Sequence, residues 1–246
     1  DIRHHPTRAL MFVVGRGSER IIAIRTDITD GAFTNLKSFD DPTLPPSSSP
    51  SLRAAGAVYS SGAPIGLAFS VDGKRGYVLH EQGFSVGELD LDAVASGDIK
   101  YPFVSCEKRA TQFGTDPLPY DAAAGRRLFT YSLDRKVSFN AEFASSSCHP
   151  DGSADGMVWH LNHGPRQTPA LGGRVKGSGP FNWNGSEHTL VDNMQRTMQR
   201  MGGIGMSTVE RVRLQAFIEA GLPSQPKPHR EDSAELIAQG KDLFFD

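Results

Sequence analysis

The chain has 246 residues, of which 38% are hydrophobic and 22% are charged. This balance is typical of a globular protein with enough apolar side chains for one large core or two smaller ones. The 26 basic and 28 acidic residues give a formal net charge of -2, so no sequence-wide positive field favours nucleic acid or an anionic membrane surface as a partner. No apolar run approaches the roughly 20 residues of a membrane-spanning helix, and we predict a soluble protein.

The first part of the chain has the pattern of short antiparallel strands. Residues 9–14 and 20–25 predict two strands joined by a Gly-Arg-Gly-Ser turn. Residues 64–92 predict three more strands, at 66–70, 76–80 and 84–90, with Gly-containing turns between them. These units resemble about two to three blades of a β-propeller, whereas a closed propeller has about four to eight. We therefore expect an incomplete propeller over residues 1–120, with the remaining blades outside this chain.

Two other segments of this part carry information about its surroundings. The N-terminal sequence "DIRHHPTRAL" has neither an initiator Met nor a basic-then-apolar signal segment, which predicts a mature or cut chain. Residues 40–51 are rich in Pro and Ser, and this composition predicts an exposed connection rather than a helix.

After about residue 120 the pattern changes to that of helices. Asp121 is predicted to cap a helix over residues 121–132. In the sequence "TLVDNMQRTMQRM", the apolar residues share one face of a helix that ends at Gly202 and Gly203. These apolar residues are Leu190, Met194, Met198 and Met201. The predicted fold class is therefore β followed by α, with an all-α domain over residues 121–230.

The C-terminal segment repeats an earlier pattern. Ser207 and Glu210 predict a capping box at the start of a helix that ends before Pro223. Beyond it, residues 232–246 start a further helix in which "GKDLF" echoes the "GRRLF" that begins at Gly125. We interpret residues 231–246 as the start of a second, truncated copy of the helical unit.

The chemistry of the sequence centres on "FASSSCHPDG", where Cys148 and His149 are adjacent. A c-type haem site reads Cys-x-x-Cys-His, because two thiols add to the haem vinyl groups and the following His binds the iron. Here Ser145 takes the place of the first cysteine, and a serine forms no thioether. The motif alone is weak evidence, since Cys and His are often adjacent by chance.

The sequence around this motif resembles the cytochrome c unit of the bacterial di-haem peroxidase and MauG-like superfamily, in the branch where cytochrome domains follow a β-propeller. The resemblance covers about 100 residues, roughly 121–222. The matching pieces occur in this order: "GRRLF", "FASSSCHPDGSADGMVW", "GPRQTPALGGRV", "GPFNWNGSEHTL" and "MGGIGM". It implies a covalent haem c with Cys148 as the single thioether anchor and His149 as an axial iron ligand.

The resemblance also indicates candidates for the remaining contacts to the haem. Met201, then Met198, then Met206 are candidate sixth ligands, and a thioether ligand suits electron transfer because it favours the reduced iron. His160 and His163 are competing nitrogen ligands. Arg166 and Arg174 are candidate partners of the haem propionates, and Trp159 and Trp183 are candidates for packing on the macrocycle. For each of these residues, ordinary core packing or surface exposure is an alternative.

Other readings of the same residues stay open. Cys148, His149, His160 and His163 are donors that zinc or copper can use, although their spacing is unusual. Cys106 and Cys148 could instead form a disulfide in a protein without haem. The sequence of Asn184, Gly185 and Ser186 fits a glycosylation acceptor or a simple turn. The sequence indicates nothing about calcium, and it contains no nucleophile-base set, phosphate-binding loop or paired carboxylates.

The predicted function is electron transfer by haem c within a di-haem peroxidase or MauG-like oxidoreductase. We predict no turnover by this chain alone, and we expect its partner to be a redox protein or a second haem domain. A periplasmic or extracellular location follows from the resemblance, because c-type attachment in this family is completed outside the bacterial cytoplasm. The alternative is a haem-free, propeller-type recognition module with a degenerate cytochrome domain.

Overall fold

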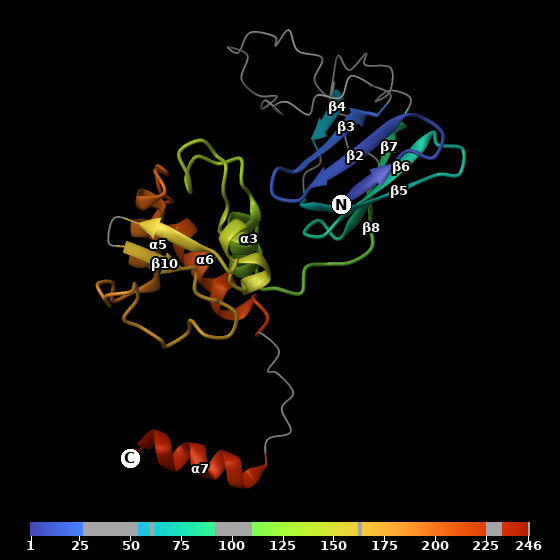
Figure 1. Cartoon of the computed structure of the whole chain (residues 1–246). Helices are drawn as coiled ribbons and strands as arrows, with labels where there is room; N and C mark the ends of the chain where they lie inside the picture. Colours follow the sequence, from blue (N-terminus) through green and yellow to red (C-terminus); the bar gives the residue numbers. More distant parts are fainter. Residues whose placement is uncertain (27–53, 60–61, 92–109, 162–163, 225–232, 246) are drawn as a thin grey trace.

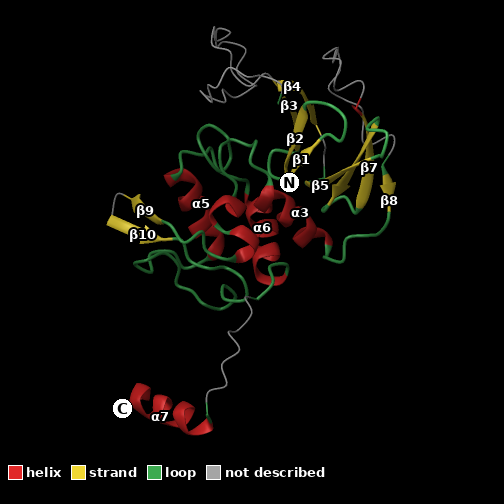
Figure 2. Ribbon diagram, turned by 45° about the vertical axis from the view of Figure 1, so that its right-hand side comes forward, coloured by secondary structure: helices red, strands yellow, loops and turns green. Residues whose placement is uncertain are grey.

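The computed structural model describes residues 1–26, 54–59, 62–91, 110–161, 164–224 and 233–245. The predictions for residues 40–51, Cys106 and His163 lie outside these ranges. The described strands before residue 113 gather on one side of the molecule, and most of the helices lie on the other side together with a short hairpin over residues 158–167 (Figures 1 and 2). We call residues 1–112 the strand part and residues 120–224 the helical part.

The strand part contains two antiparallel sheets of four strands each. The first has the order β1 (Ile2–His4), β2 (Leu10–Gly15), β3 (Arg20–Arg25) and β4 (Ala54–Tyr59). The second has the order β5 (Pro64–Phe69), β6 (Arg75–His80), β7 (Ser85–Asp90) and β8 (Thr111–Gln112). Sequential neighbours pair throughout, so both sheets are simple meanders. The predicted hairpin over residues 9–25 and the predicted strands between residues 64 and 92 are confirmed, with small changes at their ends.

Alternating burial explains how these strands form a core. In β6 the residues alternate between exposed and buried, and β2 has the same period of two. The inward side chains of both sheets form one cluster, in which Phe12, Val78 and Leu89 are completely buried. Because the two sheets share this cluster, the strand part is a single packed unit.

The predicted fold class is wrong. The described residues form three small antiparallel sheets and five α-helices, and their strands do not close into a barrel or a propeller. The segment expected to be all-α also contains a hairpin, in which β9 (Val158–Leu161) pairs with β10 (Gly164–Gln167). Gly156, two residues before β9, and Gly164, the first residue of β10, are both at positive φ, and such backbone conformations favour turns over a helix. The fold is therefore mixed α and β.

The helical part is built around the packing of two helices. α3 (Tyr120–Thr130) lies against α6 (Thr208–Ala220), with α5 (Leu190–Arg200) beside α6. Gly125 allows the close approach, since a Cβ at this position would overlap the carbonyl oxygen of Arg213. Phe129 and Phe217 meet in the core, with ring centroids 5.3 Å apart.

The helix ends test the local predictions. Ser207 and Glu210 form the predicted capping box, with Ser207 N donating to Glu210 Oε2 at 2.9 Å. Gly202, at a φ of 75°, follows the end of α5 as predicted. Asp121, by contrast, lies in the first turn of α3 and the residue in the N-cap position is Pro119. The Asp121 carboxylate instead accepts a hydrogen bond from Arg213 of α6 at 3.1 Å.

The last described helix, α7 (Ala234–Phe245), has no buried residue and lies apart from the other described elements (Figure 1). The structure thus confirms a helix in this C-terminal segment, over Ala234–Phe245. Over the described residues, no helix combines the length and the apolarity needed to cross a membrane.

Candidate functional site

The Cys-His motif forms a tight turn between two short helical segments. α4 (Ser145–Cys148) ends with His149 as its C-cap, and the 3-10 turn η1 (Pro150–Gly152) follows directly. His149 N donates to the carbonyl oxygen of Ser145 at 2.9 Å, and Gly152 N donates to that of His149 at 3.1 Å. Ser145 and Cys148 therefore lie on one helical turn, which is the arrangement that the resemblance implies for the two anchor positions.

The orientation of the His149 ring is set by a backbone carbonyl. His149 Nδ1 lies 3.0 Å from the carbonyl oxygen of Pro169. A carbonyl oxygen only accepts, so Nδ1 carries the proton and the lone pair of the neutral ring lies on Nε2. Burial lowers the pKa of His149, so the ring stays neutral at neutral pH. A neutral imidazole whose Nδ1 donates to a carbonyl is the usual state of a histidine that binds a metal through Nε2.

Cys148 is a half-buried free thiol. Burial raises the pKa of this thiol, and the nearby carboxylate of Asp155 raises it further. The carbonyl oxygen of Cys148 accepts a hydrogen bond from Asp155 N at 3.1 Å. Cys148 is therefore held in place as a protonated thiol, without the depressed pKa of a reactive nucleophile.

A small cluster of hydrogen-bonded polar residues connects the Cys-His turn to the β9–β10 hairpin. Trp159 Nε1 donates to Asp155 Oδ2 and to Thr168 Oγ1, both at 3.0 Å. Burial opposes ionisation of Asp155, but hydrogen bonds from Met157, Thr168 and Trp159 lower its pKa overall. Asp155 is thus an ionised residue that links the Cys148 backbone to the hairpin.

The candidate methionine ligands occupy two kinds of position. Met198 and Met206 are buried in the core cluster of the helical part, together with Met194. Met201 is the half-buried C-cap of α5, and its carbonyl oxygen accepts a hydrogen bond from Phe139 N at 3.3 Å. None of these observations selects among the three, and their order as candidates stays a prediction.

The remaining candidates lie at the surface of the helical part. The Arg166 guanidinium lies 5.8 Å from the ring centroid of Trp183, which is 61% exposed. Arg174 and His160 are also exposed. In the described part of the chain, no three His, Cys, Asp or Glu side chains are grouped so that they could hold a metal ion. Asn184 is exposed in a turn, with Ser186 N donating to its side-chain oxygen at 3.2 Å.

Cavities also occur away from the Cys-His turn in the described part of the chain. One, of about 380 Å³, lies between the second sheet and α3 and is lined by His80 and Arg126 among others. Another, of about 320 Å³, is lined by residues of α3 and α6 together with Met206. Neither includes Cys148 or His149 among its lining residues, so the chemistry of the Cys-His turn does not extend into them.

The structure brings together several residues that the sequence did not single out. Pro169 and Asp155 both contact the Cys-His turn, although Pro169 is 20 residues from His149. Pro169 belongs to the quoted piece "GPRQTPALGGRV", so the resemblance pointed at its neighbourhood but not at its carbonyl group. Comparison with models of protein families, with curated proteins and with solved structures gave no match.

Proposed function

We propose that the helical part binds haem c through Cys148 and His149 and serves in electron transfer within an oxidoreductase of the di-haem peroxidase and MauG-like type. The observation that carries this proposal is the hydrogen bond from His149 Nδ1 to the carbonyl oxygen of Pro169. It holds the ring in one orientation with the proton on Nδ1, so the lone pair of the neutral ring lies on Nε2, the nitrogen that an axial ligand would use.

The residues present fit the group in two respects and depart from the usual site in one. Cys148 supplies a protonated thiol for addition to one vinyl group, directly before the ligand histidine. Ser145 occupies the other anchor position, so a single thioether is expected. The methionines of α5 and Met206 provide soft donors and apolar surface in the same part of the molecule. A bound haem would supply an iron that changes between the ferric and ferrous states.

Other parts of the proposal follow from this site. Arg166 and Arg174 are exposed or half-buried cations available to the propionates. The proposed partner is a redox protein or a second haem domain. We propose a periplasmic or extracellular location, because a c-type group is attached there in this family.

The test is the visible spectrum of the full chain made in a bacterial host that attaches c-type haem. We expect a Soret band that survives acid-acetone extraction, with a pyridine haemochrome shifted to the position of a single thioether. In Cys148→Ser the colour should become extractable, and in His149→Ala the axial spectrum should change. His188→Ala serves as the matched control, since this exposed histidine is not among the candidate ligands and its loss should leave the spectrum unchanged.

A colourless wild-type preparation from this host would contradict the proposal. It would favour the alternative of a haem-free recognition module that has kept the helical part as a scaffold. A coloured preparation in which Cys148→Ser stays resistant to extraction would contradict the assignment of the anchor. The two results are distinct, so the test separates loss of the cofactor from a wrong attachment residue.

A further inference from the structure

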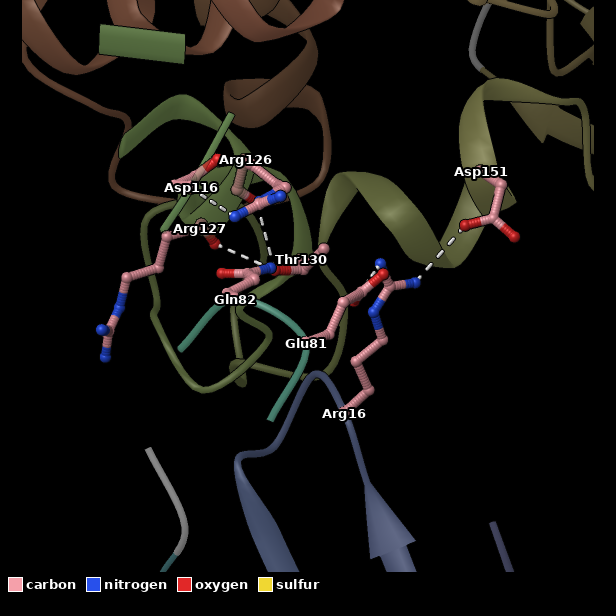
Figure 3. A network of polar contacts seen from close by, with 8 residues as sticks. All are labelled: Arg16, Glu81, Gln82, Asp116, Arg126, Arg127, Thr130 and Asp151. Atoms are coloured by element: carbon pink, nitrogen blue, oxygen red, sulfur yellow. Dashed lines mark hydrogen bonds and ion pairs between the residues drawn. The ribbon is translucent and has the colours of Figure 1, made fainter. Parts of the chain in front are cut away.

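The turn between β2 and β3 connects the strand part to the helical part. Gly17, at the tip of the turn, accepts a hydrogen bond at its carbonyl oxygen from Ser132 N at 2.9 Å. Glu19 is 3% exposed and accepts from Arg127 of α3 at 3.2 Å. On the neighbouring β6–β7 turn, Gln82 donates to Thr130 at the end of α3 at 2.7 Å. Both parts are therefore joined by specific polar contacts (Figure 3).

Arg16 of the same turn reaches the Cys-His turn itself. Its Nη2 lies 2.7 Å from Glu81 Oε2 on the β6–β7 turn, and its Nη1 lies 3.4 Å from Asp151 Oδ1. Figure 3 shows the guanidinium between these two carboxylates. A planar guanidinium can bind two carboxylates at once with separate nitrogens. One side chain thus links both sheets to the segment that carries His149.

Asp151 lies where a contact can influence the ligand. It is two residues after His149, inside η1, and has a φ of 48°. Asp is one of the few residues other than Gly that adopt this left-handed conformation at little cost. The backbone around Asp151 is tied on both sides, by Gly152 N to the His149 carbonyl at 3.1 Å and by Leu171 N to the Gly152 carbonyl at 2.8 Å. A change in the position of the Asp151 side chain should therefore also shift the His149 backbone.

We propose that Arg16 is a positioning residue. Its ion pairs with Glu81 and Asp151 hold the Cys-His turn against the strand part, and we call these contacts the latch. The strand part then has a definite role, since its Arg16 cation adds to the backbone hydrogen bonds that hold the ligand segment. The redox consequence of this latch rests on the proposed function, whereas the latch itself does not. Asp151 is 80% exposed in its side chain, so salt should weaken the latch.

The first experiment measures hydrogen exchange of residues 145–153 in the full chain without haem. Arg16→Ala and Asp151→Asn should each speed exchange there by about fivefold, which corresponds to about 1 kcal/mol for a surface ion pair. Asn tolerates a positive φ, so Asp151→Asn removes the charge without disturbing the backbone. Arg16→Lys should exchange more slowly than Arg16→Ala, because it keeps the positive charge. It should exchange faster than the wild type, because a lysine lacks the planar guanidinium that pairs with two carboxylates.

The matched control is Arg75→Ala. Arg75 forms an ion pair with Glu88 at 2.8 Å inside the second sheet, so its loss removes a similar contact without touching the Cys-His turn. Exchange of residues 145–153 should then match that of the wild type. If Arg16→Ala exchanges no faster than Arg75→Ala, the latch is wrong, whatever the result for haem.

The second experiment measures the reduction potential of the haem-loaded variants. Removing the Arg16 cation should lower the potential, because a nearby positive charge disfavours the ferric iron. Asp151→Asn should raise it, because the lost charge is negative. A merely structural role would shift both variants in the same direction, and that result would overturn the electrostatic part of the proposal. A protein without haem would contradict the proposed function and leave the exchange result to decide the latch.

Discussion

α3 and α7 carry the same local sequence pattern in opposite environments. Both contain Gly, two polar residues, Leu and Phe in succession, at Gly125–Phe129 and Gly240–Phe244. In α3 the phenylalanine is 2% exposed and the glycine is in contact with α6. In α7 the phenylalanine is 81% exposed, and no described atom lies within 4 Å of a Cβ built on Gly240.

The comparison separates the formation of a helix from its burial in the core. Both segments are helical, and both are rich in residues with a good intrinsic helix propensity, which acts locally along the chain. Burial depends on a partner, which α3 finds in α6. The same sequence pattern should therefore respond to the same substitution in very different ways, and this difference can be measured.

The largest effect is expected for the phenylalanines. Phe129→Ala removes a ring packed against Phe217 and should lower the free energy of unfolding by about 3–5 kcal/mol. Phe244→Ala removes an exposed ring, so we expect a change of about 0.5 kcal/mol or less. Urea unfolding of the two variants, followed by tryptophan fluorescence, makes the comparison. Equal losses of stability would show that α7 is packed in solution as α3 is.

The glycines should respond with opposite signs. Gly125→Ala places a methyl group against the Arg213 carbonyl and 3.0 Å from Phe217 Cβ, so α3 and α6 must separate, at a cost of about 1–3 kcal/mol. Gly240→Ala meets no atom and should strengthen α7 locally by about 0.5–1 kcal/mol. Thermal unfolding measures the first effect, and hydrogen exchange of the α7 amides measures the second. A neutral Gly125→Ala would contradict the close helix crossing.

The parts of the fold that were predictable are those with local signals. Alternation of apolar residues predicted β2, β3, β6 and β7, and the capping residues predicted the start of α6. β1 pairs with β2 through Ile2 and Val13, but three residues contain too little alternation to indicate a strand. The β9–β10 hairpin was missed because its segment was interpreted through the resemblance to an all-α domain.

The candidate site likewise contains some features that a local sequence signal predicts and others that no such signal predicts. The residue types of Cys148 and His149 indicated their chemistry directly, and that prediction is still to be tested. The carbonyl oxygen of Pro169 could not be predicted, because a backbone acceptor has no residue-type signal and its place depends on the fold. Arg16 is 135 residues from Asp151, and no local pattern in the sequence connects the two.

An ion pair at the start of α6 should make a smaller contribution to stability, and this contribution should depend on pH. Glu210 lies near Lys136 Nζ, at 2.7 Å, and the hydrogen bond from Lys136 is the main cause that lowers the pKa of Glu210 to about 2. A lowered pKa in the folded state adds stability above the unfolded pKa, and this stability is lost as the pH falls toward 2. Glu210→Gln should therefore cost about 1–2 kcal/mol at pH 7 and almost nothing near pH 2.

The measurement is urea unfolding of Glu210→Gln and wild type across pH 2 to 7. Lys136→Gln should also lose stability at pH 7, including its second ion pair with Asp134 at 3.1 Å. The double variant should lose less than the sum of the two single variants, because the Lys136–Glu210 pair is removed only once. A loss in Glu210→Gln that is the same at every pH would show that its capping of α6, rather than its charge, stabilises the helix.

The smallest effect separates two serines that begin helices. Ser207 Oγ accepts from Glu210 N at 3.3 Å, and Ser233 Oγ accepts from Leu236 N at 3.2 Å. Removing an N-cap serine costs a helix about 1 kcal/mol. In Ser207→Ala this cost should appear in the global free energy of unfolding, because α6 is part of the core. In Ser233→Ala it should appear only as faster hydrogen exchange of the first α7 amides, with an unchanged urea midpoint, because α7 contributes no buried residue. A shifted midpoint in Ser233→Ala would mean that α7 unfolds together with the core. α3 and α7 would then differ only in how exposed their side chains are.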